Sequence, residues 1–68
     1  MNTQKIHLTP REIQILSILR TTAPSNKVIT RQLNITESTV KLHVGNMLKK
    51  FGVHSRTQLI VFTKEHKI

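Results

Sequence analysis

The stretch SNKVITRQLNITESTVKLHVGNMLKKFG (25–52) contains two apolar-periodic segments separated by a short turn. The first segment predicts a short helix over 26–33, and the second predicts a longer helix over 37–51. Apolar side chains recur along the second segment at the spacing of one helical stripe. The stripe consists of Val40, Val44, Met47, Leu48 and Phe51. Two helices joined by a turn of about three residues have the spacing of a helix-turn-helix.

Capping residues indicate where these two helices begin and end. Ser25 and Thr36 are candidate N-caps, and Glu37 suits the positive end of the helix dipole. Ile35 lies in the turn, where its side chain is expected to hold the two helices together through the core. Gly52 follows the longer helix at the position where a left-handed residue is expected.

The segment before this stretch predicts another helix. Thr9 and Glu12 form a capping box, and Pro10 suits the first helical position, so a helix is expected over 9–20. Its apolar residues cover more than half of the helix circumference, which predicts the central and most buried helix. These residues are Ile13, Ile15, Leu16, Ile18 and Leu19.

The segment after the stretch predicts a fourth helix, over 56–66, because Ser55 is followed by Gln58 at capping-box spacing. The chain is therefore expected to be all-α. We predict one compact four-helix domain over 8–68 with a central helix-turn-helix, preceded by a short N-terminal tail over 1–7.

The composition favours a polyanionic partner. The 68 residues contain 11 Lys plus Arg against three Glu and no Asp, which gives a net charge of +8. Nucleic acid is the first candidate partner and an anionic membrane surface is the second, while a domain that merely happens to be basic stays open. The membrane hypothesis is weaker, because the cations are spread over several capped helices. Without a cysteine, a signal peptide or a long apolar run, the expected location is the cytoplasm.

The longer helix presents a second face almost opposite to its apolar stripe. On a helical wheel this face contains Ser38, Lys41, Leu42, Gly45, Asn46 and Lys49. In a helix-turn-helix such a face enters the major groove, where lysine can donate to guanine, asparagine can pair with adenine and leucine can contact a thymine methyl. The alternative is a solvated face. Solvated faces usually contain glutamate as well as lysine, and the only glutamate of this helix is in its first turn, so a DNA-binding face is favoured.

Gly45 is unexpected in the middle of a helix, because glycine costs about 1 kcal/mol there relative to alanine. Two interpretations stay open. A missing side chain on a DNA-binding face would let the helix backbone approach the bases or leave room for water. Alternatively, Gly45 is a tolerated surface residue.

Phosphate contacts require donors beside the base-reading face. Ser25, Asn26 and Lys27 offer a hydroxyl, an amide and a cation next to the free backbone N–H groups of a helix start. Thr36 and Thr39 are placed in the same way at the start of the longer helix, although ordinary capping also explains Ser25 and Thr36. For three more cations, phosphate contact and simple solvation are both open: Arg31, Lys50 and Arg56.

LTPRE (8–12), the segment 25–56 and the apolar helix after it together resemble the LuxR/FixJ/NarL-type helix-turn-helix domain over nearly the whole chain. Within this family, ITESTVK (35–41) and the HV, MLKK and SR runs after it look closest to regulators of the nitrate/nitrite response. The resemblance implies a four-helix DNA-binding domain, with the third helix in the major groove and dimerisation through the fourth. It further implies base contacts from Lys41, Leu42 and Gly45, and DNA-backbone contacts from Ser25, Asn26, Lys27, Thr39 and His43.

The expected helix 56–66 contains four consecutive apolar residues that point in four directions. A peripheral helix in so small a domain can bury only about half of them, which indicates a partner surface. Leu59 and Phe62 are expected to pack inward. The residues expected to meet a second copy are Ile60, Val61 and Lys64. In the alternative, Ile6 and Leu8 of the tail cover all four apolar side chains.

An enzyme is not expected, and neither is a metal or cofactor site. The glutamates are scattered, and the four histidines have neither i, i+4 spacing nor a carboxylate partner. The sequence predicts a bacterial transcription regulator, or the DNA-binding half of one, that binds double-stranded DNA as a weak or conditional homodimer. RNA polymerase is left open as a further partner. The alternative hypothesis is an interaction protein that pairs through helix 56–66 with a full-length relative and modulates it.

Overall fold

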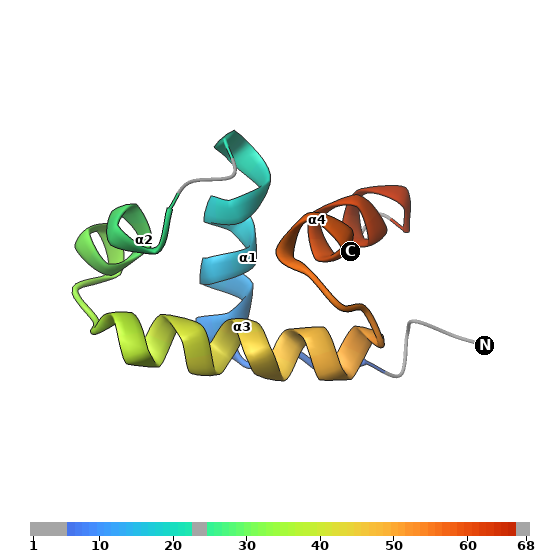
Figure 1. The fold of residues 1–68 in the computed structure, drawn as a ribbon, viewed down its shortest axis with the longest axis horizontal. Helices are drawn as coiled ribbons and strands as arrows, with labels where there is room; N and C mark the ends of the chain where they lie inside the picture. The colour runs from blue at the N-terminus through green and yellow to red at the C-terminus, as the bar shows by residue number, and fades with distance from the viewer. Residues whose placement is uncertain (1–5, 23–24, 67–68) are drawn as a thin grey trace.

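The computed structural model describes residues 6–22 and 25–66. This part of the chain forms four helices: α1 (Pro10–Thr22), α2 (Asn26–Leu33), α3 (Glu37–Phe51) and α4 (Arg56–Glu65). The predicted all-α, four-helix fold is confirmed. Helix α3 is the longest and runs across the molecule, while α1, α2 and α4 all lie on the same side of it (Figure 1).

The core lies between α3 and the other three helices. It consists of Ile15, Leu16, Leu19, Ile29, Val40, Val44, Met47, Phe51 and Leu59. The apolar stripe predicted for α3 is confirmed, because four of its five members are in this core and the fifth, Leu48, packs against it. Since full burial of such a side chain contributes about 1.5–3 kcal/mol, the stripe fixes which side of α3 faces inward.

The start of α1 is the predicted capping box. The Thr9 N–H donates to Glu12 Oε1 at 3.0 Å, and the Glu12 N–H donates to Thr9 Oγ1 at 3.1 Å. The helix continues to Thr22, two residues beyond its expected end. A proline restricts mainly the residue directly before it, so Pro24 does not prevent Thr22 from being helical.

The turn between α2 and α3 is built on a left-handed residue. Asn34 has φ 56° and ψ 46°, and its N–H donates to the Thr30 carbonyl. Asparagine is one of the few residues with a side chain that visits this conformation routinely. Ile35 follows half-buried against the core, and Thr36 caps α3 by accepting a hydrogen bond from the Thr39 N–H at 3.2 Å. The expected turn and its anchoring isoleucine are both confirmed.

The end of α3 is a Schellman motif. Gly52 has φ 69°, its N–H donates to the Lys49 carbonyl at 3.3 Å, and the Val53 N–H donates to the Leu48 carbonyl at 3.0 Å. This is the left-handed C-terminal residue that the sequence predicts. The chain then turns toward α4, whose cap, Ser55, accepts from the Gln58 N–H at 3.1 Å. Helix α4 ends at Glu65, one residue before its expected end.

Two local expectations are wrong. Ile13 is 54% exposed, and the central helix is α3, which packs against the other three helices, and not α1. Helix α1 packs chiefly against α3 and α4. Ser25 occupies the N-cap position of α2 with extended backbone, but its side chain makes no capping hydrogen bond.

Helix α3, at 15 residues, is the longest described, and none of the helices in the described residues combines the length and hydropathy that crossing a bilayer requires.

Candidate nucleic-acid interface

The side of α3 that faces away from the core carries all six residues predicted to face bases. Four of them are exposed and two, Gly45 and Asn46, are half-buried. Leu42 is 61% exposed, which is the largest exposure of any large apolar side chain in the described residues. The exposed members are Ser38, Lys41, Leu42 and Lys49. Because α1, α2 and α4 lie on the other side of α3, none of the described helices covers this face (Figure 1).

The dimensions of this face suit a DNA groove. Helix α3 has 15 residues, which corresponds to about 22 Å. Lys41 and Lys49 are two turns apart on the same face, about 12 Å along the helix axis. A major groove about 12 Å wide admits one α-helix and displays base edges that lysine and asparagine can pair with.

The fold does not require glycine at position 45. A Cβ atom added to Gly45 would meet no atom within 4 Å outside its own turn of helix. Its backbone is ordinary right-handed helix, whereas the only described glycine with a positive φ is Gly52. Gly45 therefore lies in open space on the exposed face.

The start of α2 is held by a residue of α4. The Arg56 Nη1 donates to the Asn26 Oδ1, so the amide predicted to contact phosphate is already oriented by a cation. Simple solvation of Arg56 is thereby excluded. Ser25 and Lys27 are exposed beside this pair, and the Ser25 hydroxyl is not used for capping. The group combines donors and positive charge at a helix N-terminus, where the backbone N–H groups also favour anions.

The hydroxyls at the start of α3 are engaged with each other. Thr36 Oγ1 and Thr39 Oγ1 lie 2.9 Å apart in a hydrogen bond, in addition to the capping bond. Thr36 is exposed and Thr39 half-buried, so both stay accessible candidates for phosphate contact. His43 is half-buried one turn further along α3, and Arg31 is exposed on α2.

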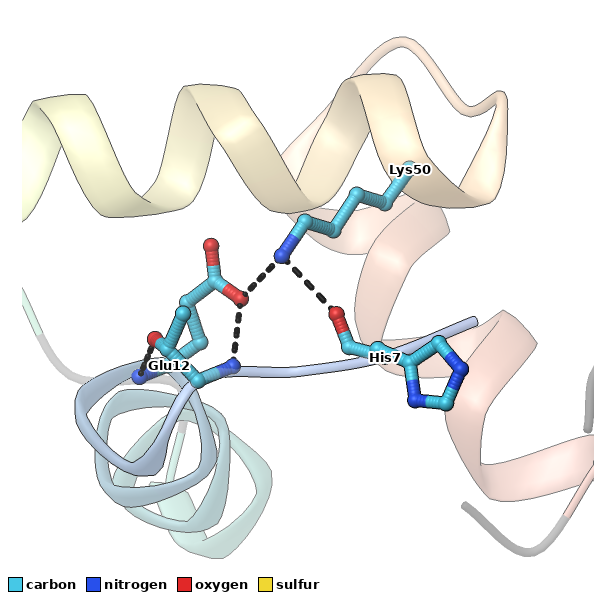
Figure 2. Close-up of polar contacts among 4 residues, drawn as sticks. His7, Glu12 and Lys50 are labelled. Carbon is cyan, nitrogen blue, oxygen red and sulfur yellow. Dashed lines mark hydrogen bonds and ion pairs between the residues drawn. The ribbon is translucent and has the colours of Figure 1, made fainter. Parts of the chain in front are cut away.

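Lys50 is not simply solvated, because it is bonded within the domain. Its Nζ donates to Glu12 Oε1 at 2.7 Å and to the His7 carbonyl at 2.9 Å (Figure 2). Glu12 is only 2% exposed, so this ion pair lies at the edge of the core. The Lys50–Glu12–His7 clip joins the end of α3 to the start of α1 and to the segment before it.

The environment of Glu12 favours its charged form. Burial raises the pKa of the Glu12 carboxyl, whereas the hydrogen bonds from Lys50 and from the Thr9 N–H, together with electrostatic interactions with Lys50 and His43, lower it. The lowering contributions together prevail, and the pKa lies below its ordinary value.

The exposed side of α4 contains two of the three residues predicted to face a second copy. Val61 is 47% exposed and Lys64 is exposed, whereas Ile60 is half-buried and packs against the core. Leu59 is fully buried, and Phe62 packs inward with its ring centroid 5.5 Å from that of Phe51. The alternative in which the tail covers all four apolar residues is wrong, because Val61 stays open.

A metal site does not emerge from the geometry. Over residues 6–22 and 25–66, no three histidine, cysteine or acidic side chains gather in a way that could hold a metal ion.

Comparisons with known proteins agree with this architecture. The family model of bacterial regulatory proteins, luxR family, matches residues 7–63. The chain is 49% identical over 61 residues to the nitrate/nitrite response regulator protein NarL of Escherichia coli K12, which covers 90% of this chain and 28% of that relative. It is 43% identical over 65 residues to the CsgBAC operon transcriptional regulatory protein of the same strain, covering 96% of this chain and 30% of the relative.

A third relative is the transcriptional regulatory protein DegU of Brevibacillus brevis, which is 46% identical over 54 residues, covering 79% of this chain and 22% of the relative. The chain thus spans less than a third of the length of these relatives. The expected resemblance to regulators of the nitrate/nitrite response is confirmed. From the match over 7–63 and from these relatives, the chain belongs to the LuxR family of bacterial regulatory proteins, as a helix-turn-helix domain of the DNA-binding kind.

Proposed function

We propose that this domain binds double-stranded DNA sequence-specifically and regulates transcription, with α3 as the recognition helix in the major groove. The observation that carries the proposal is the uncovered face of α3. That face displays two exposed lysines and a leucine that is 61% exposed. The relatives support the regulatory role, since their names describe response regulators and operon regulatory proteins.

Each side chain of the face has a chemical role in this proposal. The residues that face bases are Ser38, Lys41, Leu42, Gly45, Asn46 and Lys49. Lysine donates to guanine O6 and N7, asparagine pairs with adenine, and Leu42 contacts a thymine methyl. The residues that contact phosphates are Ser25, Asn26, Lys27, Thr36, Thr39 and His43. Arg31 is a further candidate for phosphate contact.

The domain acts as a weak or conditional homodimer through α4, with Ile60, Val61 and Lys64 at the interface. A two-fold dimer reads an inverted repeat whose half-site spacing matches the dimer geometry. Regulation of bacterial transcription takes place on the chromosome, so the domain works in the cytoplasm, and RNA polymerase is its natural further partner. Residues 8–68 form the DNA-binding unit, and residues 1–7 form a tail before it.

A second candidate function is modulation of a longer relative by pairing through α4. The exposed Val61 supports it, and so does the length of the relatives, of which this chain covers only 28% in one case. A protein acting in this way needs no DNA affinity of its own. Binding of the isolated domain to duplex DNA separates the two functions.

The proposed function predicts different effects for two lysines. Lys41→Ala should weaken binding to a duplex selected from a random pool about tenfold or more, and should relax the preference at one base pair, because a good base contact is worth about 1–3 kcal/mol. Lys27→Ala should weaken all duplexes alike and reduce the slope of log affinity against log salt by about one, because it removes a phosphate contact. Titrations at several salt concentrations measure both effects.

Gln14→Ala is the control for these titrations, since Gln14 is exposed on α1 and should leave binding unchanged. The proposed function fails if the isolated domain binds no duplex at any salt concentration, or if its affinity does not depend on salt. If Lys41→Ala binds the selected duplex as tightly as the original protein does, the role of α3 as recognition helix is rejected.

A further inference from the structure

Gly45 is a residue of the exposed α3 face whose identity the packing of the domain does not explain. A glycine in the interior of a helix makes the folded protein less stable than an alanine would, because glycine loses more backbone freedom on folding. A compensating reason would be a positive φ or a close approach by another part of the chain. Neither exists at this position, since the backbone is right-handed helix and an added Cβ would meet no atom within 4 Å.

The neighbours of Gly45 define what lies around it on this surface. Residues three and four positions apart on a helix are adjacent, with Cβ atoms about 5–6 Å apart. Leu42 is therefore adjacent on one side, while Lys41 and Lys49 are adjacent in the preceding and following turns. All three neighbours are exposed. Bare backbone at Gly45 thus continues the apolar surface of Leu42, and cations stand next to this apolar strip.

This strip is complementary to one particular group on a base edge. Glycine offers no side-chain donor or acceptor, so a purine edge facing it would lose hydration of its N7 and of its exocyclic group without gaining a partner. The C5-methyl group of thymine is the apolar projection of the major groove and needs no hydrogen bond. It also needs space, which a missing side chain provides.

We propose that Gly45 is a specificity-determining residue whose bare backbone receives a thymine methyl in the bound DNA, next to the thymine that Leu42 contacts. The inference rests on the proposed function, because it requires α3 to lie in the major groove. Each half-site should then prefer thymine at two adjacent positions, and the protein recognises both by shape and not by hydrogen bonds.

Deoxyuridine provides the first test, because it differs from thymidine only by the missing methyl group. Each thymine of the selected half-site is replaced by deoxyuridine in turn, and affinity is measured by titration. At the position facing Gly45 the loss should be about fourfold, which is the value of one buried methyl group. A second sensitive position should face Leu42, and Leu42→Ala should abolish the sensitivity at that position alone.

Gly45→Ala provides the second test, because it adds one methyl group to the protein at the same place. The variant should melt about 4–8 °C higher, since alanine is the better helix former. It should nevertheless bind the thymine duplex about tenfold more weakly, because two methyl groups would compete for one space. On the duplex with deoxyuridine at that position most of the affinity should return. Gln14→Ala, an exposed α1 residue, should change neither affinity.

The return of affinity on the deoxyuridine duplex is the decisive result. If Gly45→Ala weakens binding to both duplexes equally, or weakens neither, the thymine assignment is overturned. It is also overturned if the original protein is insensitive to deoxyuridine everywhere outside the Leu42 position. Sequence-specific binding without these effects would leave the proposed function intact, whereas absence of any duplex binding would remove the proposed function itself.

Discussion

Glu12 has two functions at once in the folded domain. Its carboxylate completes the capping box of α1 and accepts the hydrogen bond from Lys50. Glu12 is only 2% exposed, and burying a carboxylate costs free energy unless it is paired with a cation and hydrogen-bonded. Lys50 provides the cation, and the Thr9 N–H provides a further hydrogen bond. The clip therefore links the stability of the start of α1 to the end of the proposed recognition helix.

The clip makes stability depend on pH in a defined direction. Because the pKa of Glu12 is lower in the folded protein than in the unfolded chain, its contribution is fully present above the ordinary glutamate range, about pH 4.3. The contribution is lost as the pH falls through the lowered pKa. The free energy of unfolding, measured by urea denaturation between pH 7 and pH 3, should therefore decrease toward acid.

Glu12→Gln should be less stable at pH 7 and should lose less stability on acidification, because glutamine has no charge to lose. Glu37→Gln is the matched control, since Glu37 is exposed in the first turn of α3 and lies outside the core. It should retain the acid dependence of the original protein. An acid dependence of Glu12→Gln as steep as that of the control would contradict the role of the clip.

The sequence predicts half of this arrangement. Thr9 and Glu12 are three residues apart, and local spacing is enough to predict their reciprocal hydrogen bonds. Lys50 is 38 positions from Glu12, and no local pattern joins them. Lys49 and Lys50 are identical in type, but the 100° between them on the helix points one toward the exposed face and the other toward the start of α1. Which of the two lysines pairs with Glu12 depends on how α1 and α3 pack together, and local sequence spacing does not show this.

At the scale of elements, the glycine within α3 and the glycine that follows it, Gly45 and Gly52, should respond oppositely to the same substitution. Gly52→Ala places a side chain at φ 69°, which costs about 1–2 kcal/mol and should lower the melting temperature by about 4–8 °C for each kcal/mol. Gly45→Ala should raise it. An added Cβ meets no atom at either position, so the difference isolates backbone conformation from packing. Thermal unfolding followed by circular dichroism measures both, and shifts of the same sign would contradict the Schellman motif.

The ends of the helices were largely predictable because they depend on local chemistry. The Thr36 cap, the Ser55 cap and the left-handed Gly52 all stand where their spacing predicts. The exposure of Ile13 was not predictable, because five apolar residues on one helix do not reveal which of them lacks a neighbour. The sequence also could not predict that the Ser25 hydroxyl makes no capping hydrogen bond, since a residue can occupy the N-cap position without using its side chain.

At the scale of the whole molecule, the proposed dimer predicts cooperative binding to two half-sites. Val61→Glu should abolish this cooperativity and weaken binding to the full inverted repeat by at least about tenfold, because one linked contact is lost. Binding to a single half-site should be unchanged. Since Val61 is 47% exposed, the variant should fold normally. Titration of one-site and two-site duplexes, with circular dichroism as a check of folding, measures the effect.

Val61→Ile is the control for this test, because it keeps an apolar side chain on the exposed side of α4. It should preserve cooperativity. If Val61→Glu binds the inverted repeat as tightly as Val61→Ile does, then α4 is not the dimer interface.

The sequence did not predict how far Ile60 would be buried. Ile60 is half-buried and packs against the core, and a run of consecutive apolar residues does not indicate which of them has an inward neighbour.

The uncovered face of α3 has a consequence for how such a domain can change over time. The fold is held by the stripe on one side of this helix, and Ser38, Lys41, Leu42, Gly45 and Lys49 are outside the core and the residues packed against it. Substitutions at these positions leave the free energy of folding almost untouched, apart from the helix preference of glycine. If this face reads DNA as proposed, such a domain can diverge to new target sequences after gene duplication without first acquiring compensating mutations. For the same reason, the proposed function predicts that its specificity can be exchanged by transplanting these few side chains onto a related helix.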